Sequence, residues 1–325
     1  MRYMNFQARL AVGARNGNLF KAGKLRYFWL ILLLTCSSAV WAKVDTITYR
    51  GYKNCYQISN RLSKVIIVPE SGGRVLAFTY NGKNIIQQDS TLNGKYYADW
   101  KKTQIDPDGG RLDYGPIEEV WTIHGQTWMG KWKVTSVGEY SVSIAFEKDS
   151  LLGLSSERTF TLDKRSAKLT TLQNATNISN RVLTRHYWSR TLVPQGGEVV
   201  IKLNPKSRFK QGWGRFIFEP ASISQDDHDP RLTVKDNVLR FKSEGETYKF
   251  GADLKKGEIN YYYNGLKFQK KYKVGDLDKY YGSEHMNTIF YHCPRFFEIE
   301  PTSETFKLEP GQSMSFTEVW KLSQM

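Results

Sequence analysis

The sequence predicts an all-β protein built as one large antiparallel β-sandwich. Short runs of alternating or β-branched residues recur along the chain, such as 74-RVLAFTY-80 and 140-YSVSIAFEK-148. Pairs with turn-forming chemistry, Asn81-Gly82 and Asn264-Gly265 among them, separate these runs. No long segment has a helical period, and no Pro- or Ser-rich linker divides the chain. We therefore expect residues 43–325 to form a single sandwich domain.

The remaining predicted strands rest on the same two signals, β-branched alternation and flanking turn residues. In chain order they are 64-KVIIVP-69, 168-KLTTLQNATNIS-179, 197-GEVVIKLNP-205, 215-RFIFEP-220, 232-LTVKDNVLRFK-242 and 259-INYYYNGLKFQKKYKV-274. The turns between strands are predicted at 163-DKRS-166, 194-PQGG-197, 235-KDN-237 and 309-EPGQ-312.

Residues 1–42 have the character of a secretory signal peptide. They contain six Lys or Arg and no acidic residue, and they end in the apolar run 28-FWLILLLTCSSAVWA-42 with a V-x-A cleavage pattern. The run is shorter than the roughly 20 residues of a membrane-spanning helix. We therefore expect cleavage after Ala42, no membrane span in the mature protein, and a periplasmic or secreted location. Retention of the segment as an anchor and lipid attachment at Cys36 are the alternatives.

This prediction is tested at the N-terminus of the mature protein. We expect mass spectrometry to find a start near Lys43, because the V-x-A pattern ends at Ala42. An intact chain in the cytoplasm would contradict it.

The chain is basic, and its charge bears on the partners that it can have. The formal charge of the whole chain is +15, and loss of the six positive charges of residues 1–42 leaves +9. This balance favours an anionic partner such as an acidic glycan, a phosphorylated sugar or the cell envelope, and a solvated cationic surface explains it equally well. No Lys/Arg run is dense enough for a nucleic-acid arm, so we expect no nucleic-acid partner.

The sequence indicates no cofactor. It has no phosphate-binding loop. The segment 225-QDDHDP-230 has residue types that bind metals, yet its crowding is typical of turn and capping chemistry, so we expect no metal there. Cys55 and Cys293 remain after cleavage. They are expected either to close a disulfide between the two ends of the domain or to stay as two small buried thiols.

A series of motifs with glycine, histidine and glutamate runs along the chain. In order they are 69-PESGGRVLAFTYNGKNII-86, 109-GGRL-112, 123-IHGQTWMGKWKV-134, 174-NATNISNRVLTRHYWS-189, 295-RFFEIEP-301 and 308-LEPGQSMSFTEVWKL-322. This order resembles the opening hairpin, arginine turn, His-Gly motif, second-histidine strand, glutamate strand and closing hairpin of the galactose mutarotase-like (aldose 1-epimerase-like) superfamily. The resemblance spans about residues 50–322. The segment 50-RGYKNCYQISN-60 and the closing hairpin look closest to a bacterial group within it, a domain of unknown function.

The resemblance implies a sugar site with a proton-transfer pair. Anomer exchange needs a base that removes the O1 proton and an acid that protonates the ring oxygen. By resemblance Glu300 is the base and His186 the acid, while Arg111 and His124 hold hydroxyls or an anionic group of the sugar. The glycine after His124 would let the backbone turn so that the imidazole points into the groove. Aromatic faces for the sugar ring are expected from Trp128, Trp132, Tyr187 and Trp188.

Each of these assignments has a purely structural alternative. The His-Gly pair also suits an ordinary tight turn, and His186 also suits a strand histidine that pairs with backbone. Glu298 lies two residues before Glu300 and therefore on the same face of one strand, where it rivals Glu300 or joins it in a sugar pocket. Arg111 would also suit a bridge to Asp108 or Asp113.

Three functions therefore stay open on the sequence alone. The first is an exported sugar-binding protein with aldose epimerase-like chemistry on a sugar or sugar acid. The second is a glycan-binding protein that keeps the groove without the chemistry. The third is a polysaccharide lyase-like enzyme on acidic glycans, for which Tyr291 or the tyrosines of 260-NYYYN-264 would serve as base.

Overall fold

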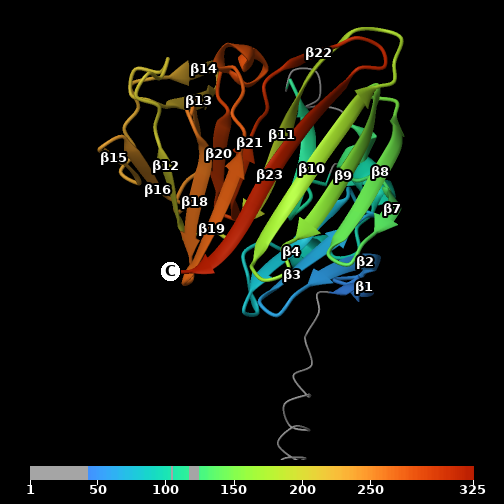
Figure 1. The fold of residues 1–325 in the computed structure, drawn as a ribbon. Coiled ribbons are helices and arrows are strands. Elements are labelled where there is room, and N and C mark those ends of the chain that lie inside the picture. The colour runs from blue at the N-terminus through green and yellow to red at the C-terminus, as the bar shows by residue number, and fades with distance from the viewer. Residues whose placement is uncertain (1–42, 104, 117–123) are drawn as a thin grey trace, which may run out of the picture. The chain divides into compact units, whose positions relative to one another are not determined.

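The computed structural model describes residues 43–103, 105–116 and 124–325, and the predicted signal segment lies outside this part of the chain. The described residues form two antiparallel sheets (Figure 1). The larger sheet has 13 strands among these residues. In spatial order its main path is β1 (Lys43–Tyr49), β2 (Tyr52–Ser59), β3 (Ser63–Val68), β4 (Arg74–Tyr80), β6 (Gly110–Gly115), β11 (Leu183–Val193), β21 (Phe296–Pro301), β20 (Thr288–Cys293), β17 (Tyr248–Ala252), β13 (Gly214–Phe218) and β14 (Ala221–Ser224). The short strands β5 (Lys83–Asn84) and β22 (Phe306–Leu308) pair with β4 and β11.

The smaller sheet has 10 strands among the described residues. Its order is β15 (Leu232–Lys235), β16 (Val238–Lys242), β12 (Glu198–Lys202), β18 (Gly257–Tyr263), β19 (Leu266–Tyr272), β23 (Ser313–Gln324), β10 (Lys168–Asn177), β9 (Leu154–Leu162), β8 (Ser141–Asp149) and β7 (Lys133–Val137). Among the described residues, helical structure is confined to short pieces: the helix α2 (Tyr97–Thr103) and the single 3₁₀ turns η1 (Ser90–Leu92), η2 (Gln126–Trp128), η3 (Leu277–Lys279) and η4 (Tyr281–Ser283). None of these helical segments is long and apolar enough to cross a membrane.

The main hydrophobic core lies between the two sheets. Its largest members are aromatic, and they come from both layers: Phe78, Tyr187 and Phe297 from the larger sheet, and Phe268 and Trp320 from the smaller one. Alternate residues of each strand point into this core, as the period of two in the sequence requires. The prediction of one large antiparallel sandwich is confirmed.

The hairpin turns follow the predicted chemistry. Asn264 and Gly265 have φ values of +47° and +75° and connect β18 to β19, with Tyr263 paired to Leu266. Asn81 and Gly82 have φ values of +47° and +80° between β4 and β5. Both central residues of such a two-residue turn need positive φ, which asparagine and glycine accept at the lowest cost.

The disulfide alternative for the two cysteines is wrong. Cys55 lies in β2 and Cys293 ends β20, and both are buried free thiols. Five strands of the same sheet separate β2 from β20, at a spacing of about 4.8 Å per strand. A disulfide requires Cα atoms within about 7 Å of each other, so the sheet order forbids this bond.

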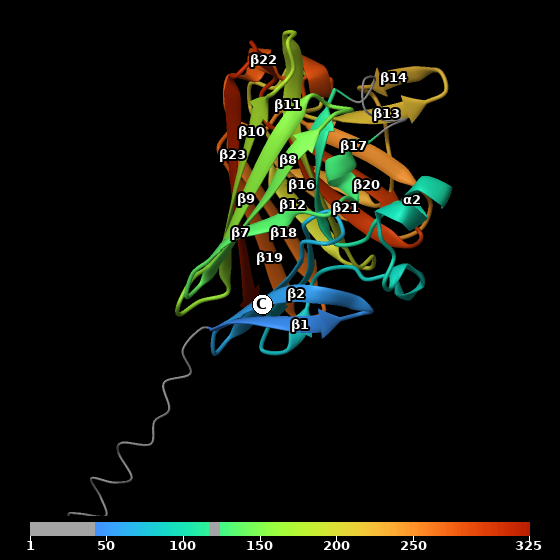
Figure 2. The same ribbon diagram turned by 90° about the vertical axis from the view of Figure 1, so that its right-hand side faces the viewer.

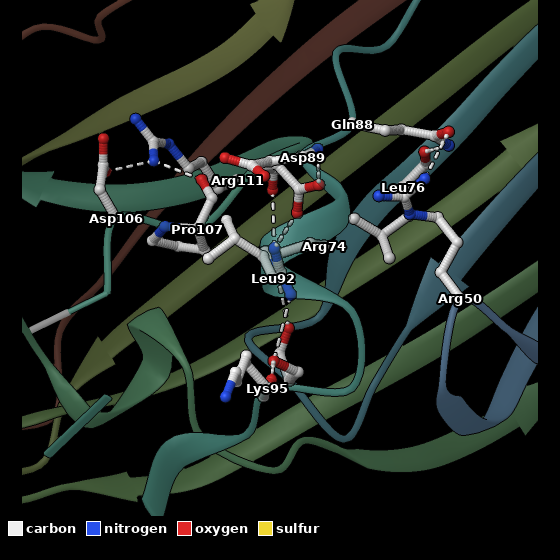
Figure 3. A network of polar contacts seen from close by, with 12 residues as sticks. Arg50, Arg74, Leu76, Gln88, Asp89, Leu92, Lys95, Asp106, Pro107 and Arg111 are labelled. Carbon is white, nitrogen blue, oxygen red and sulfur yellow. Dashed lines mark hydrogen bonds and ion pairs between the residues drawn. The ribbon is translucent and has the colours of Figure 1, made fainter. Parts of the chain in front are cut away.

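The long connection between β5 and β6 carries α2 and is anchored by two buried arginines (Figure 3). Arg74 from β4 donates to the Asp108 carboxylate and carbonyl at 2.8 Å each. Arg111 from β6 bonds the Asp106 carboxylate and the Pro107 carbonyl. Figure 2 shows α2 beside β20 and β21, at the edge of the outer face of the larger sheet. The anchored connection thus places aromatic residues of this segment next to that face.

Candidate functional site

The candidate site lies on the outer face of the larger sheet, where β6, β11 and β21 run side by side. In the register of β6 with β11, Arg111 is opposite Arg190 and Asp113 is opposite Trp188. In the register of β11 with β21, Leu192 is opposite Glu298. On β11 the even-numbered residues from His186 to Arg190 share this outer face. The odd-numbered ones point inward, as the hydrogen bond of Ser189 to Glu318 on β23 shows.

Glu298 is the centre of a buried ion cluster. Its Oε1 accepts from Arg111 Nη2 at 2.7 Å and from Arg190 Nε at 2.8 Å. Its side chain is 1% exposed, and those of Arg111 and Arg190 are 0% and 7% exposed. Burial alone would raise the pKa of Glu298, but the two guanidinium groups outweigh it and hold the pKa well below the usual range. Glu298 is therefore a carboxylate that organises two arginines.

His124 belongs to a second polar cluster at this face. Its Nδ1 lies 2.9 Å from Asp113 Oδ2, and its ring stacks on Trp128 with centroids 4.5 Å apart and planes 7° apart. The guanidinium carbons of Arg111 and Arg190 lie 4.8 and 5.1 Å from the centroid of the same indole. A carboxylate on Nδ1 and a flat indole surface together fix the orientation of the imidazole.

The backbone at the His-Gly pair differs from the expectation. His124 itself has positive φ, +30°, whereas Gly125 has φ −46°. The glycine is needed for space, because a Cβ at residue 125 would lie 2.2 Å from Leu152 Cδ1 and 2.4 Å from Asp149 Oδ2. Asp149 in turn accepts the Thr127 N–H at 2.9 Å. The histidine therefore makes the turn, and the glycine lets β8 and its following turn pack against it.

Glu300 lies beside Glu298 on β21 and has different surroundings. Its Oε2 accepts the indole N–H of Trp188 at 2.5 Å, and its residue is 1% exposed. Burial and the neighbouring charge of Glu298 raise the pKa of Glu300, while Lys249, Arg190 and the Trp188 hydrogen bond oppose this rise. Two same-face carboxylates thus have pKa values pushed in opposite directions, a pattern typical of acid–base sites.

One cavity collects most of these groups, and we call it the acid–base cavity. Its volume is about 390 Å³. Among its lining residues are His124, Trp128, Trp188, Arg190, Glu298 and Glu300, joined by Trp100 from α2 and by Lys249 and Tyr291. Two buried donors at its wall, Trp128 Nε1 and Arg190 Nη1, have no hydrogen-bond acceptor among the described residues. Aromatic faces, buried donors and carboxylates are the groups that a polar ring-shaped ligand requires.

His186 lines a neighbouring cavity instead. Its imidazole packs against Gly115 and Gly282, and its Nδ1 has no hydrogen-bond partner in the part of the chain that the structure describes. Burial lowers the pKa of His186 to about 4. The register places Glu300 next to Arg190, which is four residues along β11 from His186, or roughly 14 Å of strand. The two cavities meet at Trp188, Phe218 and Lys249.

Several predicted site residues take other positions. Arg111 does not line the acid–base cavity. It donates a hydrogen bond to Glu298, which does line the cavity. Trp132 and Tyr187 are 1% and 0% exposed members of the main core, so neither offers a face to a ligand. The tyrosines of residues 260–264 lie on β18, in the smaller sheet. The sequence could not anticipate these positions, because a motif's aromatic content does not tell which face of the sheet a residue occupies.

Three cations of the acid–base cavity were missed by the sequence reasoning. They are Arg190, Lys249 and Arg295. Arg190 had a detectable signal, since it follows Trp188 by two residues and so shares its face of the strand. Lys249 and Arg295 had none, because the pairing of β17, β20 and β21 brings them to the site.

The segment 225–230 behaves as a set of ion pairs. Lys210 contacts Asp226 at 2.5 Å, Arg215 contacts Asp227 at 2.9 Å, and Arg231 contacts Asp229 at 2.7 Å. Across residues 43–325, outside the undescribed positions, no group of three or more histidine, cysteine or acidic side chains is arranged to hold a metal ion.

Comparison with known proteins defines the fold. No family model matches the sequence, and no curated protein matches it. Among solved structures, the Slr1438 protein from Synechocystis sp. PCC 6803 has a TM-score of 0.61 at 11% identity, covering 86% of this chain and 100% of its own. A galactose mutarotase-like protein from Clostridium acetobutylicum has a TM-score of 0.58 at 12% identity, covering 88% and 99%. A candidate aldose 1-epimerase from Escherichia coli K12 has a TM-score of 0.57 at 12% identity, covering 83% and 99%.

The chain has the galactose mutarotase-like fold. The similarity extends over nearly the full length of these structures, which matches the span of the motifs in the sequence. At this level of identity it establishes the architecture, and the chemistry has to be argued from the residues of the site. Assignment to the bacterial group with a domain of unknown function stays a prediction.

Within the galactose mutarotase-like fold, the site residues come from the middle of the larger sheet. β6 and β11 contribute Asp113, Trp188 and Arg190, and β21 contributes the two glutamates. The turn at η2 adds His124 and Trp128. Residues up to 187 positions apart, Arg111 and Glu298, are in direct contact there.

Proposed function

We propose that the protein binds a sugar or sugar acid in the acid–base cavity and interconverts its anomers by proton transfer. The observation that carries this proposal is the presence of Glu300 and the Asp113-bound His124 in one cavity with aromatic walls. Ring opening of an aldose needs one proton acceptor and one proton donor, and it needs no metal or nucleotide. Trp128 and Trp188 offer indole surface to the apolar side of a pyranose ring.

The two roles follow from the surroundings of each group. Glu300 accepts the proton of the O1 hydroxyl, while His124 donates a proton to the ring oxygen. The bond between C1 and the ring oxygen breaks, and the electron pair of O1 forms the aldehyde. Rotation about the C1–C2 bond and the reverse transfers close the ring as the other anomer. The Asp113 carboxylate, 2.9 Å from Nδ1 of His124, holds the imidazole in place for this transfer.

This assignment gives His186 a different part from the one that the family resemblance implies. Its pKa of about 4 keeps the imidazole neutral near pH 7, without the proton that an imidazolium acid must donate. Its cavity joins that of Glu300 only at the shared wall. We therefore assign the acid to His124 and place His186 outside the proton-transfer pair.

The two histidine variants test this choice directly. We expect His124→Ala to slow anomer exchange by roughly 100 to 10,000-fold, the usual effect of losing a positioned acid. His186→Ala should slow it by less than about tenfold. Exchange is followed by NMR on a panel of neutral, amino and uronic aldoses. The opposite ranking would return the acid role to His186, and equal rates in both variants and the natural protein would reject catalysis by either histidine.

The cationic side of the cavity supports a sugar acid among the ligands. Arg111 and Arg190 are engaged by Glu298, so neither is available as a lone counter-charge. Lys249 and Arg295 line the cavity, and neither forms an ion pair with a carboxylate of the described residues. A carboxylate or phosphate on the sugar would meet these two cations. The comparison of neutral with uronic sugars in the NMR panel tests this point.

A lyase mechanism has less support. It requires a tyrosine or histidine base beside an arginine that neutralises the uronate. Tyr291 lines the cavity, but burial raises the pKa of its hydroxyl, which opposes the phenolate form needed to remove a proton. Sugar binding without any anomer exchange would make the protein a non-catalytic glycan-binding protein.

Export is part of the proposal. It is supported by the basic and apolar composition of residues 1–42 and by the V-x-A pattern that ends at Ala42. An exported protein of this kind would meet glycans of the cell envelope or its surroundings. The mass of the mature N-terminus decides this point independently of activity.

A further inference from the structure

A second cavity adjoins the acid–base cavity, and we call it the apolar cavity. Its volume is about 300 Å³. Its wall is formed largely by the β13–β14 hairpin and by the η4 turn, and its apolar members include Phe216, Phe218, Ala221, Ile223 and Ile289. Its charged lining residues are Glu284 and Lys249, the latter at the junction with the acid–base cavity. The part of the wall formed by the apolar side chains therefore suits an uncharged group.

The apolar cavity is continuous with the acid–base cavity. Trp188, Phe218 and Lys249 belong to the walls of both. The ammonium of Lys249 lies 5.7 Å from the ring centroid of Trp188 and 4.8 Å from that of Phe216. A ligand that passes from one cavity to the other therefore meets an indole held by Glu300 and a hydrogen-bond donor at the junction.

The apolar cavity also contains one polar group without a described partner. His186 is 2% exposed and lines the wall, and its Nδ1 finds no hydrogen-bond partner among the described residues. The adjacent Gly282 is part of the same wall, and a Cβ there would lie 2.9 Å from that nitrogen. With its pKa lowered to about 4 by burial, the imidazole is neutral near pH 7 and adds a flat, uncharged surface to this wall.

We propose that the apolar cavity binds an uncharged alkyl or aryl group that is joined, through an oxygen other than O1, to a sugar held in the acid–base cavity. A cavity of about 150 Å³ already accommodates benzene, so the volume here is sufficient for a larger ring or a short alkyl chain. Lys249 at the junction donates a hydrogen bond to the linking oxygen. This inference rests on the proposed function, because the sugar part of the ligand occupies the site described above.

The proposal is tested with sugar ethers that keep O1 free and differ only in the attached group. Methyl, butyl, hexyl and phenyl ethers of glucose, galactose and glucuronic acid, substituted in turn at each hydroxyl other than O1, are titrated calorimetrically into the mature protein. We expect affinity to rise by about fourfold for each added methylene until the cavity is filled. In Ala221→Trp, which places an indole at the wall of the apolar cavity, this dependence should disappear while the methyl ethers still bind. Ser224→Trp on the same strand lies outside the lining residues and should retain it.

The outcomes separate this inference from the proposed function. Equal affinities for methyl and hexyl ethers at every substituted position, with sugar binding retained, would overturn the apolar cavity as a binding site and leave the proposed function standing. Failure of every free sugar and methyl ether to bind would reject the proposed function. In that case binding of 2-naphthol to the natural protein and to Ser224→Trp, but not to Ala221→Trp, would still support an aryl-binding cavity, and no binding of 2-naphthol would overturn it.

Discussion

Glu300→Gln is expected to slow anomer exchange by roughly 100 to 10,000-fold, because the amide cannot accept the O1 proton. The substitution keeps the size of the side chain and one oxygen for the Trp188 indole N–H, which lies 2.5 Å from the carboxylate in the natural protein. The fold and sugar affinity should therefore be retained. Exchange rates by NMR, with binding measured by calorimetry on the same sugars, separate lost chemistry from lost binding.

The matched control is Glu309→Gln, at an exposed position in the turn between β22 and β23. It should leave the exchange rate unchanged. Because burial and Glu298 raise the pKa of Glu300, the acid limb of the rate profile is expected above the ordinary glutamate range, with activity rising as the carboxyl ionises. If Glu300→Gln exchanged anomers at the same rate as the natural protein, Glu300 would be excluded as the base.

Glu298→Gln is expected to lower the free energy of unfolding by about 3–5 kcal/mol, the typical cost of removing one partner from a buried ion cluster. It would leave Arg111 and Arg190, whose side chains are 0% and 7% exposed, without their shared carboxylate. Asp113 would remain 3.6 Å from Arg190 but cannot replace both contacts. Urea unfolding of the mature domain measures the change.

Glu147→Gln supplies the comparison for this variant. Glu147 pairs with Lys133 at 3.3 Å, and the two side chains are 76% and 72% exposed, so its loss should cost less than about 1 kcal/mol. The pH dependence has a defined sign. Because the pKa of Glu298 is lowered in the folded state, its stabilisation is complete above the ordinary glutamate pKa and is lost as the pH falls through the lowered value. Equal unfolding free energies for the two variants would contradict the buried-cluster interpretation.

The strands and several turns were predictable because their causes are local. Alternating apolar residues identify a strand with one face in the core, and Asn-Gly pairs identify two-residue turns. The same period of two placed Glu298 and Glu300 on one face of β21, as the structure has them. Lys270 and Glu318 show where this reasoning stops. They pair at 2.9 Å inside the core, on strand positions where the pattern alone would favour apolar residues.

The sequence by itself determined the fold class, the turn chemistry and the residue types available for a sugar site. Only the tertiary structure decided which of these residues meet. His124 shares a cavity with Glu300, and His186 lines the adjoining cavity. Arg111 lines neither cavity and contacts Glu298 instead. The physical reason is that periodicity reports the face of a strand and says nothing of which strands become neighbours. That order and register are set by packing between residues far apart in the chain.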